Sequence, residues 1–290
     1  MGHIENRLAE FHRISMTKES LSNAKIVFQG VEGAYSHQAM LTFFGRECDG
    51  YHVETWKDAM EDIKNGKADY AVLPIENSSA GFVSENYDLL AKYDNYIVGE
   101  QTIKIDHALL GLPEAKMEDI TQVYSHPQAF MQSLNYLDKR RNWEKISLKN
   151  TAVAAKKVCE DQNIHQAAIA SEISADIYGL KVLDHAIQDN KNNYTRFIIV
   201  SGKTVYTKEA DHISICFELS HKSGSLYQAL GHFMRHHLNM TYIQSRPTGN
   251  KNWEYWFFVD FEGNFGDENV KNAIIGLEKE TTALKILGSY

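Results

Sequence analysis

From residue 25 onward, short apolar segments alternate with segments whose apolar residues recur at helical spacing. The expected strands that each precede a helix are KIVFQ (25–29), YHVET (51–55), DYAVLPI (69–75), TQVYS (121–125), KISLK (145–149) and AAIAS (167–171). Repetition of a strand followed by a helix is the pattern of parallel sheets with helices packed on their faces. This alternation restricts the chain to an α/β fold.

Two long extended segments interrupt this alternation. YIVGEQTIKIDHALLGLP (96–113) contains no helical pattern, and RFIIVSG (196–202) is the last strand of the region. Two crossings of this kind predict that residues 25–204 form two lobes with a cleft between them. We expect one lobe at about 25–100 plus 197–204, and the other at about 101–196.

Residues 211–290 have a different pattern. Strands are expected at 212–219, within LNMTYIQSRP, within NWEYWFFVDF and at TALKILGSY, with helices at 225–237 and 267–280. This βαββαβ order predicts a ferredoxin-like domain. Residues 1–24 carry charges throughout and lack the apolar core of a secretory signal, so we expect a short amphipathic helix or a disordered extension.

Charge and cysteine content exclude several classes of protein. The net charge is −8 with acidic and basic residues intermixed, which argues against nucleic-acid partners. The apolar runs are much shorter than the roughly 18 residues that span a membrane. Cys48, Cys159 and Cys216 are distant from one another and suit a reducing cytoplasm. No Cys/His spacing resembles a metal site, and we expect no cofactor.

Small polar residues follow the expected strands at the points where helices begin. Each residue alone is explained as a helix N-cap or turn residue. In a parallel sheet, however, these junctions gather at one edge, where helix N-termini attract anions. We therefore expect a ligand with more than one carboxylate to contact Ser36, Asn77, Ser78, Ser79, Gly81, Ser125, Gln128, Thr151 and Ser171.

The segment DNKNNYTRFIIV (189–200) places Thr195 and Arg196 directly before a buried strand. If that strand is antiparallel to its neighbours, its beginning lies at their carboxyl edge, within the cleft. Alternation then places Thr195 and Phe197 on one face and Arg196 on the other. We list all three as candidates for substrate contact, and expect only one of Thr195 and Arg196 to face the reacting centre.

Several motifs together resemble prephenate dehydratase. They are GVEGAYS, PIENSSAGFV, YSHPQAF, NTAVAA, AAIAS with YGL, and NYTRF, followed by SGSLYQAL, TYIQSRP and YWFFVDFEG. The resemblance covers residues 25 to about 290. It implies that prephenate is converted to phenylpyruvate, carbon dioxide and water. It further implies lobes like type II periplasmic binding proteins, a regulatory ACT domain inhibited by phenylalanine, and a homodimer or homotetramer.

The regulatory motifs depart from the family pattern at two positions. Ser223 stands where the family usually has Pro in Pro-Gly-Ala-Leu, and Gln244 stands where it usually has Glu in Glu-Ser-Arg-Pro. These departures put regulation in doubt and leave catalysis untouched. The resemblance assigns phenylalanine binding to Gly224, Ser225, Leu226, Asn239, Ser245, Arg246 and Pro247.

The implied reaction needs a group that stabilises the departing hydroxide, and the resemblance assigns this role to Thr195. Because a hydroxyl is a poor acid, we expect Glu76 or His126 as the proton source behind it. The alternatives are that Glu76 only pairs with Arg196 and that His126 only caps a helix.

Two other functions remain open from the sequence. One is arogenate dehydratase, whose substrate carries an ammonium in place of the keto group. The other is an amino-acid sensor without catalysis. A fused chorismate mutase would need a further helical domain, and only residues 1–24 precede the first expected strand. We therefore expect a monofunctional enzyme.

Overall fold

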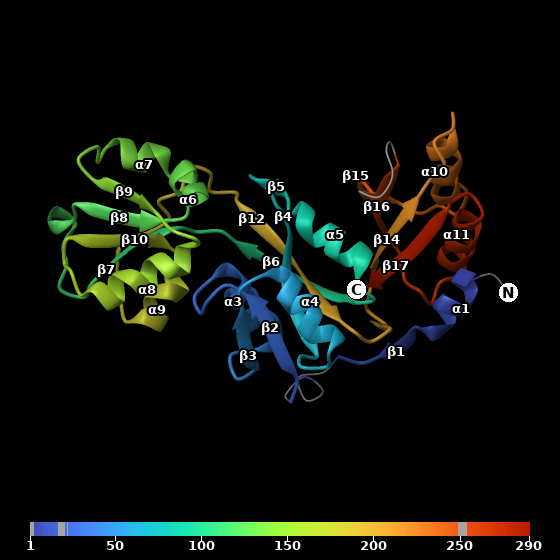
Figure 1. Ribbon diagram of the computed structural model, residues 1–290, viewed down its shortest axis with the longest axis horizontal. Helices are drawn as coiled ribbons and strands as arrows, with labels where there is room; N and C mark the ends of the chain where they lie inside the picture. The colour runs from blue at the N-terminus through green and yellow to red at the C-terminus, as the bar shows by residue number, and fades with distance from the viewer. Residues whose placement is uncertain (1–2, 17–20, 22, 249–253) are drawn as a thin grey trace.

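The computed structural model describes residues 3–16, 21, 23–248 and 254–290. These residues form three units in a row: an outer lobe, a central lobe and a C-terminal domain (Figure 1). Within these ranges, no helix combines the length and the apolar character needed to cross a bilayer.

The central lobe is an open sheet with helices on both sides. Its strands are β2 (Lys25–Gln29), β3 (Asp49–Val53), β4 (Tyr70–Asn77), β5 (Gly81–Phe82), β6 (Tyr96–Lys104) and β12 (Tyr194–Ser201), and its helices are α3 (Tyr35–Phe44), α4 (Trp56–Lys64) and α5 (Ser84–Lys92). The strand order is β6-β12-β4-β2-β3. Strands β2, β3 and β4 are parallel, whereas β12 is antiparallel to both β4 and β6. The beginning of β12 therefore lies at the carboxyl end of β4, as expected.

The outer lobe is a second sheet with its own core. Its strands are β7 (Ala108–Gly111), β8 (Gln122–Ser125), β9 (Glu144–Ser147), β10 (Gln166–Ala170) and β11 (Lys181–Asp184), and its helices are η1 (Met117–Asp119), α6 (Pro127–Gln132), α7 (Leu134–Asp138), α8 (Thr151–Asp161) and α9 (Glu172–Tyr178). The strand order is β11-β7-β10-β8-β9. The chain leaves the central sheet after Lys104 and returns at Tyr194, slightly inside the boundaries expected from the sequence.

The C-terminal domain has the βαββαβ order that the sequence predicts. Its elements are β14 (His212–Glu218), α10 (Ser225–Arg235), β15 (Met240–Pro247), β16 (Tyr255–Glu262), α11 (Glu268–Glu278) and β17 (Ala283–Ser289). The strands lie in the order β15-β16-β14-β17, which makes β15 an edge strand among the described residues.

One close backbone approach joins the C-terminal domain to the central lobe. Strand β17 meets β6 in a parallel bridge between Gly288 and Ile97, so ten strands form one continuous sheet. A Cβ atom at Gly288 would lie 2.0 Å from the carbonyl oxygen of Ile97. Glycine is therefore the residue that permits this junction.

The N-terminal segment is folded in its described part, and of the two expected alternatives, a short helix or a disordered extension, the structure shows the helix. Helix α1 (His3–Glu10) buries Ile4 to 1% exposure, and the backbone N–H of Ile4 donates to Glu278 Oε1 at 2.8 Å. Strand β1 (His12–Ile14) pairs in parallel with β13 (Val205–Thr207). Residues 17–20 and 22 lie outside the described part of the chain.

Candidate active site

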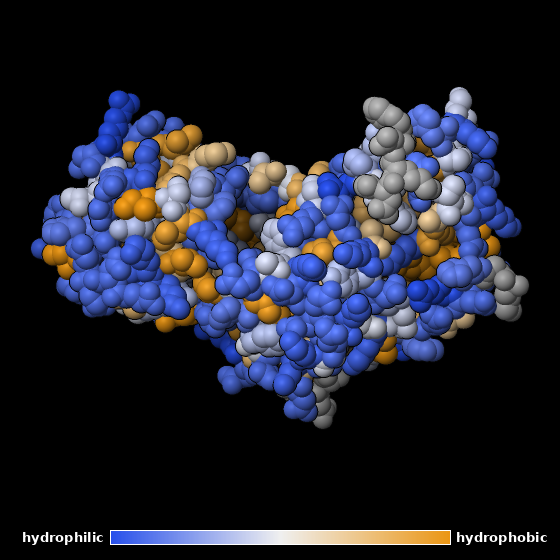
Figure 2. Space-filling model, in the orientation of Figure 1, coloured by the Kyte–Doolittle hydropathy of each residue, from blue (hydrophilic) through white to orange (hydrophobic). Residues whose placement is uncertain are grey.

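The cleft between the two lobes contains a cavity of about 440 Å³. The surface is hollowed where the lobes meet (Figure 2). The cavity is lined by Gln29, Gly30, Ala34, Tyr35, Ser36, Trp56, Pro74, Asn77, Ala80, Ile105, His107, His126, Gln128, Ala129, Gln132, Lys149, Asn150, Thr151, Thr195 and Phe197. Both lobes contribute to this lining, so a bound molecule would contact both sheets.

Strand β12 delivers Thr195 to the floor of the cavity. Thr195 pairs with Asn77 across the β12–β4 ladder and is 9% exposed. The Asn77 side-chain Nδ2 donates to Thr195 Oγ1 at 2.9 Å. Because Oγ1 accepts this bond, its own proton can be directed toward a molecule in the cavity.

The loop after β4 is fixed by its own side chains. Asn77 Oδ1 accepts from the backbone N–H groups of Ser79, at 3.0 Å, and Ala80, at 2.7 Å. Ser78 Oγ accepts from the N–H of Tyr194 at 2.9 Å, which ties the loop to the start of β12. Ser78, Ser79 and Gly81 do not line the cavity, so we correct the expectation that they contact the ligand directly.

Glu76 and Arg196 lie on the opposite face of the sheet from Thr195. They are paired across the β12–β4 ladder, and Arg196 Nε lies 3.5 Å from Glu76 Oε2. The reason is strand alternation, because Asn77 and Thr195 face the cleft and the residues next to them must face away. The prediction that Glu76 and Arg196 reach the ligand is therefore wrong, and the alternative that Glu76 pairs with Arg196 is confirmed.

The pairing of β12 with β4 shifts by one residue immediately after Arg196. Phe197 pairs with Pro74, and Ile75 of β4 is the extra residue at this point. An irregularity of this kind re-aims side chains at a sheet edge. As a result, Pro74 and Asn77 both line the cavity, together with Phe197, which is 2% exposed.

Helix N-termini face the cavity from both lobes. Ser36 lies in the first turn of α3, and its Oγ donates to the carbonyl of Gln29 at 2.6 Å. Helix α8 begins at Thr151 after Asn150, whose Oδ1 accepts from the N–H of Val153 at 2.8 Å. Such termini present unpaired N–H groups and a positive dipole end, which favour carboxylates.

Lys149 adds a cationic side chain to the same edge of the cavity. It forms an ion pair with Glu54, which places the pair across the opening between the lobes. Its position directly before the N-cap of α8 was a sequence signal that we did not use.

His126 both lines the cavity and caps α6. Its Nδ1 accepts from the N–H of Gln128 at 3.1 Å, so the ring proton of the neutral form is on Nε2. Burial lowers the pKa of His126 from 6.5, which favours the neutral ring near pH 7. Gln128 is the second residue of the same helix and also lines the cavity.

Two predicted ligand contacts instead stabilise the protein itself. Ser125 is fully buried, and its Oγ donates to the carbonyl of Ile169 at 2.6 Å. Ser171 Oγ and Ser174 Oγ both donate to the carbonyl of Gly33, at 2.8 and 2.9 Å. We therefore correct the roles of Ser125 and Ser171: the first joins neighbouring strands and the second joins the two lobes.

His107 is a cavity residue that the sequence analysis missed. It lies in the extended crossing between the lobes and is 2% exposed. Its Nδ1 is 2.9 Å from Tyr35 Oη, and its Nε2 is 2.8 Å from Gln132 Oε1. Burial lowers the pKa of His107. The one available signal was a histidine within the long extended segment that links the two lobes.

The candidates for phenylalanine binding lie in the C-terminal domain. Gly224 is the N-cap of α10 with φ of 82°, and a cavity of about 90 Å³ includes Ser225 and Leu226 in its lining. Asn239 Nδ2 donates to Glu262 Oε1 at 3.0 Å. Ser245, Arg246 and Pro247 lie on edge strand β15.

Arg246 makes a bidentate contact with the central lobe. Its Nε donates to Asp88 Oδ1 at 2.6 Å, and one terminal nitrogen donates to Asp88 Oδ2 at 2.5 Å. Asp88 lies on α5, so this arginine connects β15 to the lobe that carries Thr195.

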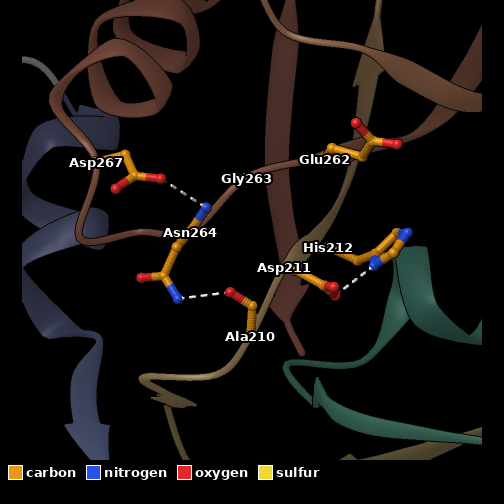
Figure 3. A pocket seen from close by; sticks show the side chains of 7 residues that line it. All are labelled: Ala210, Asp211, His212, Glu262, Gly263, Asn264 and Asp267. Carbon is orange, nitrogen blue, oxygen red and sulfur yellow. Dashed lines mark hydrogen bonds and ion pairs between the residues drawn. The ribbon is translucent and has the colours of Figure 1, made fainter.

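A second hollow, of about 350 Å³, lies beside the C-terminal domain (Figure 3). Its polar groups bond to one another. Asn264 Nδ2 donates to the carbonyl of Ala210 at 2.7 Å, and His212 Nδ1 lies 2.7 Å from Asp211 Oδ1. We assign no reaction to it. Among the described residues, no group of three or more His, Cys, Asp or Glu side chains is arranged to hold a metal ion.

The fold and the cleft define a two-lobed α/β protein whose ligand site lies between the lobes, followed by a ferredoxin-like domain. The family model for prephenate dehydratase matches residues 26–205. An arogenate dehydratase/prephenate dehydratase 2 of Arabidopsis thaliana is 38% identical over 286 residues, which cover 94% of this chain and 74% of that protein. The chain belongs to the prephenate dehydratase family.

Solved structures share most of the chain length. Prephenate dehydratase from Arthrobacter aurescens in complex with L-Phe has a TM-score of 0.82 and 30% identity, covering 92% of this chain and 89% of that one. GqqA, described as a novel type of quorum-quenching acylase, has a TM-score of 0.84 and 29% identity, covering 92% and 97%. These similarities include the C-terminal domain as well as the two lobes.

Proposed function

We propose that this chain converts prephenate to phenylpyruvate, carbon dioxide and water, with Thr195 at the reacting centre. The observation that carries the assignment is the Thr195 hydroxyl at the cavity floor, held by Asn77 and surrounded by helix N-termini. A cavity of about 440 Å³ is large enough for a single-ring dicarboxylate.

The chemistry defines what the site must supply. The C–C bond between the ring and its carboxylate breaks, and the electron pair of this bond enters the ring. At the same time the C–O bond between the ring and the hydroxyl oxygen breaks. Carbon dioxide leaves, and the departing hydroxide takes one proton to become water. Aromatisation of the ring supplies the driving force. The protein must therefore hold the second carboxylate, keep the first poorly solvated and assist the hydroxide.

We assign the retained carboxylate to the positive edge of the cavity. The N-terminus of α8 at Thr151, the N-terminus of α3 and the Lys149 ammonium all line it. These groups act on the ground state and the transition state alike, so they contribute mainly to binding.

We assign the departing hydroxide to Thr195, which donates a hydrogen bond as negative charge develops on the oxygen. His126 is the proposed second hydrogen-bond donor to the departing oxygen, because its Nδ1 accepts a backbone bond and the Nε2–H of the neutral ring is free to face the cavity. The proton that completes the water molecule comes from solvent. Glu76 is excluded from this role because it lies on the other face of the sheet.

The lining favours prephenate over arogenate. Among the described residues that line the cavity, none is Asp or Glu, and an ammonium group would be favoured by such a carboxylate.

Acyl hydrolysis, the activity named for one structural neighbour, needs a nucleophile beside a general base. Thr195 Oγ1 instead receives an N–H from the Asn77 amide.

We infer that the C-terminal domain is an ACT domain through which phenylalanine inhibits the enzyme. The supports are its βαββαβ order, Gly224 in the left-handed region at the start of α10, and an L-Phe complex of a similar structure. The edge strand β15 carries Ser245, Arg246 and Pro247, so a partner subunit in a homodimer or homotetramer would complete the site.

The test has two assays on purified protein. Phenylpyruvate absorbance follows the turnover of prephenate, with and without phenylalanine, and chromatography follows the phenylalanine formed from arogenate, whose ammonium group stays on the product. We expect turnover of prephenate at much higher kcat/KM than of arogenate, and inhibition by phenylalanine. Binding of phenylalanine without any turnover would instead establish an amino-acid sensor. Preferred turnover of arogenate would reassign the substrate.

A further inference from the structure

Arg196, the neighbour of Thr195, extends to the side of the sheet opposite the cleft and meets three carboxylates. Its guanidinium nitrogens lie 3.1 Å from Asp260, 3.4 Å from Glu100 and 3.5 Å from Glu76. Glu76 and Glu100 belong to strands β4 and β6 on either side of β12. Asp260 is different, because it lies on β16 of the C-terminal domain.

The Asp260 carboxylate is held rigidly. Its side chain is 7% exposed, and its Oδ1 accepts from Ser214 Oγ at 2.6 Å. Ser214 Oγ in turn lies 2.9 Å from the hydroxyl of Tyr290, the last residue of the chain. The oxygen that faces Arg196 is therefore fixed by β14 and the C-terminus as well as by its own strand.

The Arg196 cation lies among three carboxylates and offsets part of their charge. Burial opposes its charge, but Tyr290, Asp260, Tyr87 and Glu100 together raise its pKa. Its terminal nitrogens donate to Asp260 and Glu100, whereas its buried Nε has no hydrogen-bond partner. The position of the guanidinium thus depends on Asp260 and Glu100. Asp260 is the more buried of the two, with a side-chain exposure of 7% against 37%, so its ion pair is the less screened by solvent.

The two neighbours of β12 support it unequally beside Arg196. The ladder to β6 is regular here, whereas β4 carries one extra residue, Ile75, and the β12–β4 register shifts between Arg196 and Phe197, so β4 holds this side of the backbone less firmly. Thr195 precedes Arg196 directly, and a rotation of the Arg196 backbone rotates Thr195 with it. A misplacement of about 1 Å in a reacting group can cost on the order of 10²-fold in rate.

We propose that Asp260 is a positioning residue for the reaction, through which the docked C-terminal domain holds Thr195 in its productive orientation by way of Arg196. The C-terminal domain is then required for full turnover even without phenylalanine. This inference rests on the proposed function of the cleft.

The test compares full-length variants in the absence of phenylalanine. Asp260→Asn keeps the shape and removes the charge, and we expect kcat to fall about tenfold with KM within twofold of wild type. Ser214→Ala, which keeps the charge and removes one support, should lower kcat less. Asp260→Glu should recover part of the loss. Asp88→Asn breaks an exposed ion pair at the same domain interface and should leave kcat unchanged within twofold.

Two measurements separate positioning from mere destabilisation and from failure of the proposed reaction. Thermal unfolding should show Asp260→Asn folded at the assay temperature. Hydrogen exchange of peptides covering 194–201 should be faster in Asp260→Asn than in Asp88→Asn, whatever the substrate proves to be. Three results would overturn the inference: unchanged hydrogen exchange in β12 of Asp260→Asn, unchanged kcat of Asp260→Asn, or an equal loss of kcat in Asp260→Asn and Asp88→Asn. Absence of prephenate turnover in the wild type would overturn the reaction instead, while the exchange result still decides the role of Asp260.

Discussion

The side-chain amide of Asn77 donates a hydrogen bond to the hydroxyl oxygen of Thr195 at 2.9 Å, across two antiparallel strands and 118 residues of sequence. The same amide nitrogen also contacts the Asn193 side chain and the Tyr194 carbonyl. Asn77 therefore orients Thr195 while its own oxygen fixes the following loop. Because of this hydrogen bond, we expect Asn77 and Thr195 to act together in the reaction.

We expect Thr195→Ala to lower kcat by about 10²–10³, because it removes a positioned donor to the developing hydroxide. Thr195→Ser keeps the donor and should lose much less. Steady-state kinetics on prephenate measure both effects, with circular dichroism to show that each variant is folded. A kcat for Thr195→Ala within threefold of wild type would remove Thr195 from the chemistry.

Asn77→Ala should lower kcat more than it raises KM, because Asn77 acts through the orientation of Thr195. The double variant Asn77→Ala/Thr195→Ala should be little worse than Thr195→Ala alone, since residues that act as a unit are not additive. Ser78→Ala is the matched control, because Ser78 lies in the same loop outside the cavity. Fully additive effects on kcat would show that the two residues act separately.

His126→Asn separates hydrogen bonding to the departing oxygen from helix capping. Asparagine is a strong N-cap residue, so α6 should keep its start while the imidazole is lost. We expect kcat to fall by about 10²-fold, within the usual range for the loss of one positioned donor. His185→Asn, at an exposed site, should be neutral. Equal activity of the two variants would leave His126 only a capping role.

Stability should fall as the pH is lowered, in part through His107. Burial lowers the folded-state pKa of His107 below 6.5, so the unfolded chain binds its proton first. The stabilisation is fully present above about 6.5 and is lost as pH falls through the folded-state value. In urea unfolding from pH 7.5 to pH 5, His107→Gln should reduce the slope by up to about 1.4 kcal/mol per pH unit. An unchanged slope would show that His107 does not titrate on unfolding.

Gly224→Val should abolish the response to phenylalanine while nearly normal turnover remains in its absence. Gly224 has φ of 82°, where a branched side chain is strained, although the space around it is open. The start of α10 would shift and its N–H groups would no longer be aligned for a carboxylate. Ser223→Ala, one residue earlier, is the control. A phenylalanine titration identical in all three proteins would place the sensor elsewhere.

Local patterns predicted the elements of the fold, because the periodicity of a strand or a helix can be recognised within a single short segment. They also predicted that Thr195 and Arg196 face opposite sides of β12, since alternation alone decides this. The facing of Glu76 was missed because β4 continues to Asn77, beyond the strand expected at 69–75, so alternation applies to Glu76 as well. Ser125 and Ser171 bond to distant carbonyls, and such contacts leave no local trace.

The junction of Gly288 with Ile97 was equally invisible in the sequence, because it joins strands from regions that each appeared complete. The contact of Arg246 with Asp88 was missed for the same reason, and the motif was assigned only to phenylalanine binding. Residues that act across a domain boundary are identified by geometry, whereas residues that begin or end an element are identified by pattern.

The hydrogen bond from Ile4 to Glu278 closes a loop of 274 residues and has a consequence for how the protein is made. Helix α1 leaves the ribosome long before its binding surface on α11, since Glu278 is synthesised 274 residues after Ile4. Ile4, the buried residue of α1, must remain exposed or bind elsewhere until α11 is made. Contacts of such long range slow folding. The N-terminal helix therefore reaches its native position only after the C-terminal domain has been synthesised and folded.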